Sequence, residues 1–333
     1  MTFVESLKDR ASALKATLAF PELTDSRTAV AVARLLENKV CSVIAVGYRK
    51  DVRAALASAG IDTNIKIVDP MDRDTVDRYT AVLHEQFDGS ISEDNAIQMV
   101  QDPLMLAGLL VSEGTVDGVV AGAIHPTRDV IRAAVRTIGT DEGVGIVSSA
   151  FYMLVPSFRG VDGEVLTFSD AGVIPEPTPN ELADIGIAAA RARVLIVNDE
   201  PRVAFLSYST HSSASGPAVE KIIEAVAIFR KRFPEIQVDG ELQGDAALIE
   251  SVARSKAPRS SVAGKANVLI FPDLNSANIA YKLVQRITGC RALGPILQGL
   301  RQPYNDLSRG SSPEEIFDVA CITALMGKSK GSE

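Results

Sequence analysis

The sequence predicts an α/β protein of two doubly wound lobes with a cleft between them. The chain has 333 residues, which is long for one hydrophobic core and sufficient for two. Short β-branched runs alternate with longer amphipathic segments, as is typical of a mainly parallel sheet with helices on its faces. Because we find no internal repeat and no flexible linker, we expect the two lobes to share one continuous sheet.

The first part of the chain carries this alternation. Strands are predicted over residues 40–46, 64–68 and 117–121, and helices over residues 49–59, 92–112 and 130–138. Gly47, Gly60 and Gly114 stand where three of these elements end, because glycine permits the backbone conformations that stop a helix or turn the chain. Ser92 can accept a hydrogen bond from the first free N–H groups of the helix that follows it.

The middle of the chain changes character. Residues 146–155 and 164–169, with a turn at Asp162-Gly163 between them, predict an antiparallel pair of strands. Thr178 and Glu181 then form a capping box that begins a helix ending near residue 194. The alternation of strands and helices resumes over residues 203–208, 218–232, 246–254, 267–271, 279–287, 293–300 and 313–326.

The composition disfavours several classes of protein. A net charge of −8, with 34 Lys and Arg residues scattered along the chain, argues against nucleic acid or an anionic membrane surface as a partner. The chain has no apolar run long enough to span a bilayer, and its first residues carry charges where a signal peptide would be apolar. We therefore expect a cytoplasmic protein.

Metal and thiol chemistry are also disfavoured. The three cysteines and three histidines show no metal-ligand spacing and no C-x-x-C pair, so we expect no metal and no disulfide framework. Cys321 falls in an apolar helical pattern and is expected in the core. Cys290 follows Gly289 in a predicted loop and is expected to be more exposed, but neither cysteine is a favoured nucleophile.

Three loops place small polar residues directly before a helix: residues 209–216, 273–278 and 305–312. The free N–H groups and the dipole at a helix N-terminus attract anions. The same residue types are also the commonest turn and cap residues, so each loop has a purely structural alternative. Arg309 makes the third loop the strongest candidate, because a bidentate phosphate donor stands there beside Ser308 and the sterically open Gly310.

Arg132 is a second candidate for binding an anion. It lies on the helix that follows the predicted strand 117–121, and open α/β sheets place their ligands at the carboxyl ends of their strands. The alternative interpretation is an ordinary solvated arginine on a helix surface.

Five segments resemble the phosphate acetyltransferase (phosphotransacetylase) family in order and spacing. They are DGVVAGAIHPTRDVIR (residues 117–132), LSYSTHSSA (206–214), DGELQGDAAL (239–248), ANVLIFPDLNSANIAY (266–281) and GPILQGLRQPYNDLSRG (294–310). The match runs over most of the chain, and its last two segments are the most specific.

The resemblance implies reversible transfer of an acetyl or other short acyl group between an acyl phosphate and coenzyme A. It implies no tightly bound cofactor, since coenzyme A, acyl phosphate and phosphate are substrates, and it implies a homodimer. The implied fold is related to that of isocitrate and isopropylmalate dehydrogenases. Its first lobe, residues 1–143, is completed by residues 295–333, and residues 144–294 form the second lobe.

The resemblance also assigns roles to particular residues. Ser308 would donate a hydrogen bond to the developing oxyanion, and Arg309 would bind the phosphate and hold the acyl phosphate in place. Arg132 would contact substrate phosphates. The substrate pocket would be shaped by Ser207, Ser209, Thr210, Ser213 and Asn278.

The family's catalytic base is an aspartate shortly after the SRG sequence, and this chain has Glu315 at that place. The carboxylate is retained, one methylene further from the backbone, and would take the thiol proton of coenzyme A. Ser312 and Glu315 also match a capping box. A structural role is therefore an equal alternative, and the two roles could be shared.

Two binding segments depart from the family pattern. Basic positions of an RxxKG stretch are replaced by Glu85 and Asp88, and the Lys-Gly pair of LSxSTKGSA by His211 and Ser212. Acidic residues at the first place should weaken binding of an anionic substrate. A divergent, non-catalytic paralogue that binds a phosphorylated ligand is therefore an alternative function. A decarboxylating dehydrogenase is a weaker alternative, because the sequence offers no convincing aspartate cluster for a divalent metal.

Overall fold

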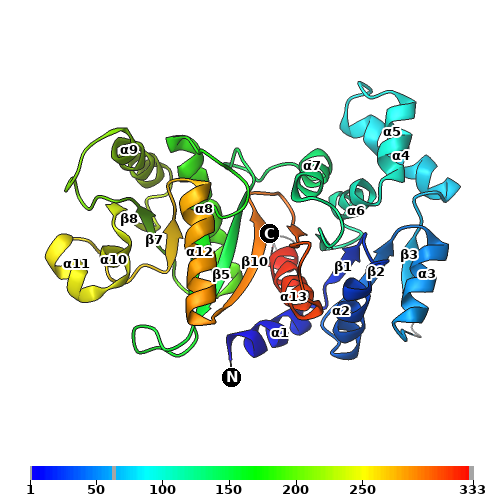
Figure 1. The fold of residues 1–333 in the computed structure, drawn as a ribbon. Coiled ribbons are helices and arrows are strands. Elements are labelled where there is room, and N and C mark those ends of the chain that lie inside the picture. The colour runs from blue at the N-terminus through cyan, green and yellow to red at the C-terminus, as the bar shows by residue number, and fades with distance from the viewer. Residues whose placement is uncertain (1, 62–64, 330–333) are drawn as a thin grey trace. The chain divides into compact units, whose positions relative to one another are not determined.

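The computed structural model describes residues 2–61 and 65–329 (Figure 1). The chain forms two compact units, of which unit 1 contains residues 1–139 and 300–333 and unit 2 contains residues 140–299. The described strands form one sheet of five strands in unit 1 and one of six in unit 2. The expectation of a single continuous sheet is therefore wrong, because every described strand pairs only within its own unit.

The sheet of unit 1 is parallel, in the order β11-β4-β1-β2-β3. Its strands are β1 (Thr17–Phe20), β2 (Ser42–Val46), β3 (Lys66–Val68), β4 (Gly118–Ala121) and β11 (Tyr304–Asp306). All residues of the inner strand β4 and of the edge strand β11 are buried, as expected for a parallel sheet with both faces covered. The carboxyl ends of β1, β4 and β11 therefore lie side by side at one edge of this sheet.

The helices of unit 1 pack against these strands or against one another. They are α1 (Phe3–Leu14), α2 (Ser26–Glu37), α3 (Arg49–Ser58), α4 (Arg73–Gln86), α5 (Glu93–Gln101), α6 (Pro103–Ser112), α7 (Thr127–Thr137) and α13 (Pro313–Ser329). Helix α13 packs against α1, α2 and β4, whereas α6 packs against α5, α7 and β4. The last helix in the sequence thus belongs to the core of the first unit.

Unit 2 has a mixed sheet in the order β10-β5-β6-β9-β7-β8. Its elements are β5 (Ser148–Val155), β6 (Glu164–Ser169), α8 (Pro179–Ile196), β7 (Arg202–Leu206), α9 (Pro217–Arg232), β8 (Gln237–Leu242), α10 (Gly244–Leu248), α11 (Glu250–Lys256), β9 (Val268–Ile270), α12 (Leu274–Thr288) and β10 (Arg291–Gln298). The predicted antiparallel pair is confirmed as β5 and β6, and β10 adds a second antiparallel partner to β5.

Helices cover both faces of this sheet. Val203 and Phe205 of β7 pack with α8 and α9, whereas Ala204 and Leu206 of the same strand pack with α10, α11 and α12. The alternation follows from the two-residue period of a strand, which sends successive side chains to opposite faces. The doubly wound arrangement predicted from the sequence is therefore present in unit 2.

Two predicted segments are divided in the structure. Residues 92–112 form α5 and α6 instead of one helix, because Pro103 favours an extended conformation at Asp102, which then caps α6. Residues 246–254 fall into α10 and α11, separated by the extended backbone of Ile249. Residue 64 of the predicted strand 64–68 lies outside the described residues. Elements missing from the sequence prediction are α1, β1, α2, α4, β8 and β11.

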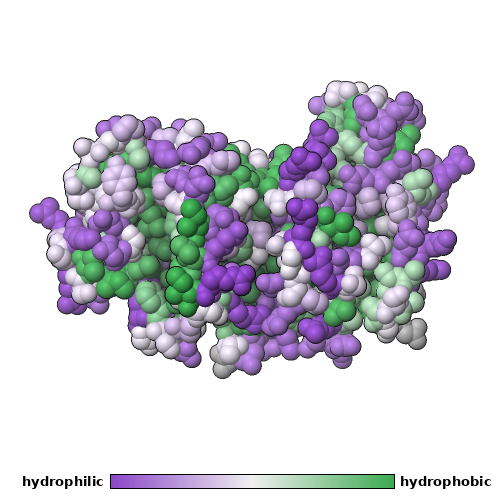
Figure 2. Space-filling view, viewed as in Figure 1, coloured by the Kyte–Doolittle hydropathy of each residue, from purple (hydrophilic) through white to green (hydrophobic). Residues whose placement is uncertain are grey.

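Helix α12 exposes a stripe of large apolar side chains. Ile279, Leu283 and Ile287 are 58%, 54% and 79% exposed, and their spacing of four residues places them on one face of the helix. Figure 2 shows this stripe as a green band at the place that α12 occupies in Figure 1. Contiguous exposed apolar surface of this kind commonly marks an interaction site.

Candidate functional site

Three loops of unit 1 meet at the carboxyl edge of its sheet. They follow β1, β4 and β11 and cover residues 21–25, 122–126 and 307–312. Ligands of open parallel sheets bind at this edge, where loop N–H groups and helix N-termini gather. The third loop carries Ser308 and Arg309, and α7, which carries Arg132, begins directly after the second loop.

Glu22 connects the first loop to the second by hydrogen bonds. Its carboxylate is buried and accepts hydrogen bonds from the backbone N–H groups of Ala123, Ile124 and His125 at 2.7, 3.1 and 2.9 Å. The same carboxylate lies 2.6 Å from Nδ1 of His125. A buried carboxylate is stable only when it is paired and hydrogen-bonded in this way, so Glu22 fixes both the loop and the His125 ring.

Arg27 connects the second loop to the third by hydrogen bonds to their backbone carbonyls. Its guanidinium forms an ion pair with Asp25 at 2.9 Å and donates to the carbonyl of Ala123 at 2.9 Å. It also donates to the carbonyls of Arg309 and Ser311 at 2.7 and 3.2 Å. One planar donor group thus holds the backbone of both loops in register.

The turn over residues 308–310 is exposed. Ser308 Oγ accepts a hydrogen bond from the N–H of Gly310 at 3.3 Å. Within the part of the chain that the structure describes, the Arg309 guanidinium forms no ion pair. Its backbone is fixed while its charge is available to an anion.

The predicted capping box at the start of α13 is present. Ser312 N–H donates to Glu315 Oε2 at 2.8 Å, and Glu315 N–H donates to Ser312 Oγ at 3.2 Å. The structural role considered for Glu315 is therefore observed. Its second oxygen, Oε1, takes no part in the cap.

Asp306, at the end of β11, is fully buried beneath these loops. Its Oδ2 accepts a hydrogen bond from Thr127 Oγ1 at 2.6 Å, and its Oδ1 has no hydrogen-bond partner among the described residues. Burial, and next to it the nearby Glu22 charge, raises the pKa of Asp306 to about 7. Gly122 is needed at this place, because a Cβ there would collide with Asp306 Oδ1 and its φ of +102° suits glycine.

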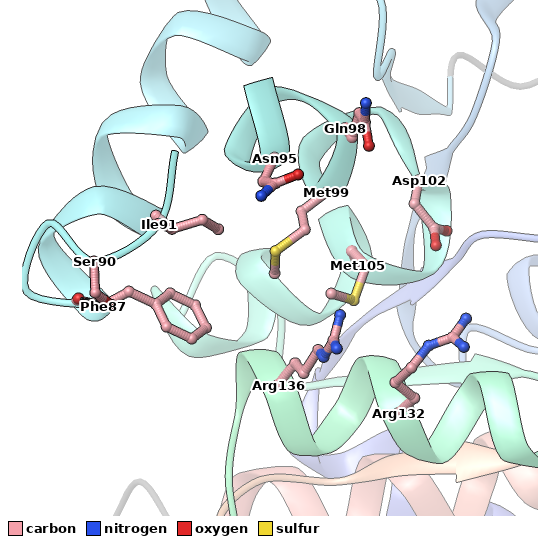
Figure 3. A pocket seen from close by; sticks show the side chains of 10 residues that line it. All are labelled: Phe87, Ser90, Ile91, Asn95, Gln98, Met99, Asp102, Met105, Arg132 and Arg136. Carbon is pink, nitrogen blue, oxygen red and sulfur yellow. Dashed lines mark hydrogen bonds between the residues drawn. The ribbon is translucent and has the colours of Figure 1, made fainter. Parts of the chain in front are cut away.

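A cavity of about 620 Å³ lies beside α7 in unit 1 (Figure 3). Arg132 and Arg136, one turn apart on α7, point toward it, and Arg132 forms an ion pair with Asp129 at 3.1 Å. The remaining lining side chains are amide, apolar or thioether groups, one hydroxyl and one carboxylate: Phe87, Ser90, Ile91, Asn95, Gln98, Met99, Asp102 and Met105. Neither Glu85 nor Asp88 lines this cavity.

In unit 2, the loop after β7 is held together by its own hydroxyl groups. Ser209 is fully buried, and its Oγ donates to Glu241 Oε1 at 2.8 Å and accepts from the N–H of Ala214 at 3.0 Å. Thr210 is also buried, and its Oγ1 accepts from the N–H of Gln243 at 2.9 Å. The side chains of these two predicted substrate-binding residues therefore hydrogen-bond to the loop itself and to the end of β8.

The other predicted residues of unit 2 are more accessible. Ser207 is partly exposed and its Oγ accepts from the N–H of Ser209 at 3.2 Å, while Ser213 is exposed. Asn278 lies near the start of α12, and its Nδ2 donates to the carbonyl of Ala171 at 3.3 Å. The loops after β7 and β9 lie at the same edge of the sheet, because these strands are parallel neighbours.

A charged cluster surrounds a second cavity, of about 450 Å³, in unit 2. Asp239 is buried and contacts His211 Nε2 at 3.1 Å and Arg230 at 2.7 Å. His211 and Ser212 have φ values of 45° and 65°, a left-handed conformation that is costly for these residues. The N–H of Ser212 donates to Glu241 at 2.7 Å, which helps to hold this conformation.

All three cysteines are buried, so the expectation of a more exposed Cys290 is wrong. Its side chain packs into the core formed by β5, β6 and α12. Burial raises the pKa of the Cys41 thiol to about 12 and also raises the pKa of Cys321. A buried thiol with a raised pKa is a poor nucleophile.

Residues 2–61 and 65–329 contain no group of three or more His, Cys, Asp or Glu side chains able to hold a metal ion. The same residues contain no helix that is both long and apolar enough to cross a membrane.

Comparison with known proteins places the whole chain among acyltransferases. Residues 2–324 match the family model described as phosphate acetyl/butaryl transferase. The chain is 38% identical over 329 residues to the phosphate acetyltransferase of Acetivibrio thermocellus, covering 98% of this chain and 99% of that protein. It is 39% identical over 330 residues to that of Clostridium acetobutylicum, covering 98% and 99%.

Solved structures similar to this chain include a member of the same family and a more distant protein of the same fold. A phosphotransacetylase from Streptococcus pyogenes has a TM-score of 0.91 at 37% identity, with 98% of each chain covered. A 4-hydroxythreonine-4-phosphate dehydrogenase from Klebsiella pneumoniae has a TM-score of 0.56 at 12% identity, covering 93% of this chain and 99% of that one. The second likeness concerns the fold alone, and it confirms the predicted dehydrogenase-like class.

Proposed function

The chain belongs to the phosphate acetyltransferase family, and we propose that it transfers an acetyl or other short acyl group reversibly between an acyl phosphate and coenzyme A. The observation that carries this proposal is the exposed Ser308–Arg309 turn, whose backbone Arg27 holds at the carboxyl edge of the sheet. A fixed guanidinium beside a hydroxyl suits a phosphate and a developing oxyanion. The non-catalytic alternative has no support from the relatives, which are named as enzymes.

The proposed reaction needs neither a metal nor a protein nucleophile. Arg309 binds the phosphoryl group, and Ser308 donates a hydrogen bond to the carbonyl oxygen as it becomes negative. Glu315 takes the thiol proton through Oε1, while Oε2 keeps its bond to Ser312. The sulfur then bonds to the carbonyl carbon and the carbon–oxygen bond to phosphate breaks. Coenzyme A is thus a substrate, and no bound cofactor is required.

The cavity beside α7 is proposed to hold an anionic part of coenzyme A. Its volume of about 620 Å³ falls in the range of small-molecule sites, and its two guanidinium groups supply positive charge. In this chain Glu85 and Asp88 replace basic residues of the family's RxxKG stretch. We propose that Arg136 supplies positive charge in place of those residues. In unit 2, Ser207, Ser213 and Asn278 are proposed to contact substrate, with Ser209 and Thr210 shaping the loop.

Replacing Arg132 with alanine should raise the KM for coenzyme A about tenfold and leave kcat nearly unchanged, because a charge-assisted hydrogen bond to a phosphate is lost. Steady-state kinetics with coenzyme A as the varied substrate measure this. Arg128→Ala is the matched control, since Arg128 lies on the same helix with its side chain 85% exposed and does not line the cavity. An unchanged KM in Arg132→Ala would refute this use of the cavity.

The activity itself is tested by thioester formation from acetyl, propionyl and butyryl phosphate with coenzyme A, followed by absorbance. We expect turnover with at least one of these, and the ranking of their kcat/KM values identifies the acyl group. Stabilisation by coenzyme A or phosphate in a thermal unfolding assay, without turnover of any acyl phosphate, would instead establish the non-catalytic binding protein.

We also propose that two copies pair through the apolar stripe of α12, consistent with the homodimer expected from the sequence. The same helix face on each copy would meet its symmetry mate, as in most twofold dimers. A cytoplasmic location remains a prediction from the sequence.

The dimer is tested with Leu283→Glu, which places a charge at the centre of the stripe and should convert the protein to a monomer in light scattering after size-exclusion chromatography. Met71→Glu is the control, because Met71 is a 57% exposed apolar residue of unit 1 and its replacement should leave the dimer intact. A monomeric wild-type protein would contradict the proposal.

A further inference from the structure

We propose that His125, oriented by the buried carboxylate of Glu22, is the general acid that protonates the departing phosphate. In the reverse direction it is the base that removes the proton from incoming phosphate. This inference rests on the proposed function and assigns a catalytic role at the same edge of the unit 1 sheet.

The geometry fixes which ring nitrogen is available. Glu22 accepts the N–H groups of Ala123, Ile124 and His125 and lies 2.6 Å from His125 Nδ1. An ionised carboxylate can only accept, so Nδ1 carries the hydrogen that lies between the two groups. Nε2 is then the nitrogen that gains and loses a proton. The His125 side chain is 40% exposed while that of Glu22 is 1% exposed, so the ring is anchored at one end and accessible at the other.

The loop of His125 lies beside the turn proposed to hold the phosphate. A single guanidinium, that of Arg27, donates to Ala123 in the first of these segments and to Arg309 and Ser311 in the second. Because the donor nitrogens of one guanidinium are close together, the backbones of the two segments are held within a few hydrogen-bond lengths of each other. His125 is two residues from Ala123 in this arrangement.

The reaction requires a proton at this place. The acyl phosphate is a dianion near neutral pH, so breaking its carbon–oxygen bond without a proton would release a phosphate trianion. Transfer of the Nε2 proton to the leaving oxygen yields hydrogen phosphate and neutral His125. The thiol proton taken by Glu315 and the proton given by His125 then balance, and both groups are reset by exchange with water.

Several charged groups lie near His125 or its partner Glu22. Glu22 pairs with Nδ1, and Arg27 and Asp306 both interact electrostatically with Glu22. Arg128 and Asp129, the charged residues of the first turn of α7, stand three and four residues after His125 and pair with each other at 3.7 Å. The arrangement in which a buried carboxylate orients an imidazole is the one that acid–base catalysis by histidine uses.

The test compares His125→Ala, His125→Asn and wild-type protein in both reaction directions across pH. We expect His125→Ala to lower kcat about 100-fold, with the KM for acyl phosphate changed only a few-fold. Added imidazole should raise the kcat of His125→Ala about tenfold, because it can replace the missing acid in the space left by the ring. The pH profile of thioester formation by the wild-type protein should differ from that of both variants, because the variants lack the group that transfers the proton. His125→Asn retains a donor for Glu22, so it separates loss of the acid from loss of the loop structure.

His84→Ala is the control, since His84 lies on α4, outside these loops, and is not among the residues that line the cavity. It should keep wild-type kcat and show no effect of imidazole. An active wild-type protein with His125→Asn within threefold of its kcat, or a His125→Ala variant that imidazole does not rescue, would overturn the inference alone. A wild-type protein without turnover would instead refute the proposed function.

Discussion

Replacing Arg309 with alanine is expected to lower kcat/KM for the acyl phosphate about 1000-fold, with both binding and rate affected. The guanidinium lies on an exposed turn and forms no ion pair within the described residues, so its charge is available to the phosphoryl group. The side chain adds nothing to the contacts that hold the turn, because Arg27 binds the carbonyl of Arg309 and not its side chain. The variant should therefore unfold at the wild-type temperature.

Two further variants sharpen this test. Arg309→Lys keeps the charge but loses the bidentate geometry and should fall between wild type and Arg309→Ala. Arg53→Ala, on the exposed face of α3, removes an equal charge from unit 1 and should leave the kinetics unchanged. If Arg309→Ala kept the wild-type KM for acyl phosphate, the phosphate-holding role would be excluded.

Replacing Glu315 with glutamine is expected to lower kcat by about 100-fold or more and leave both KM values nearly unchanged, because the amide cannot take the thiol proton. Glutamine is also a normal partner in a capping box, so the bonds to Ser312 should survive and stability should hardly change. The variant thus removes the base and keeps the cap. Steady-state kinetics and chemical denaturation measure the two effects separately.

Ser312→Ala is the complementary variant. It removes the hydroxyl that accepts the Glu315 N–H, which should cost about 1 kcal/mol of stability and leave kcat unchanged. A Glu315→Gln variant with wild-type kcat would assign Glu315 to capping alone.

The local parts of the fold could be predicted from the sequence. The capping boxes at Thr178 and at Ser312, and the cap at Ser92, form as predicted because each depends on residues three positions apart. The residue pattern alone did not predict the division of the strands into two sheets, because this division depends on pairings between distant segments; only the family resemblance implied that the C-terminal segment completes the first lobe. β11 joins β4, and β10 joins β5, at separations that leave no local signal in the sequence.

The site could be predicted only in part, for the same reason. Arg309 and Ser308 stand out as a motif, whereas Glu22 and Arg27 look like ordinary charged loop residues. Their importance comes from partners 101 and 282 residues away, Ala123 and Arg309, which no short pattern reveals. One local feature of the sequence indicates the position of Arg27. Asp25 is a typical N-cap residue at the start of α2, so Arg27 lies in the first turn of that helix.

The order of segments along the chain has a consequence for biosynthesis. Unit 2 is continuous, so a ribosome can release all of its residues before residues 300–329 of unit 1 appear. Until then β4 lacks its neighbour β11, and α1 and α2 lack the helix α13 that packs against them. Contacts between segments far apart in the sequence form slowly, because bringing their ends together costs the intervening chain conformational entropy. The amino-terminal part of unit 1 is therefore expected to expose apolar surface until these segments are made, and the loops that Arg27 joins can assemble only after residues 307–312 have been synthesised.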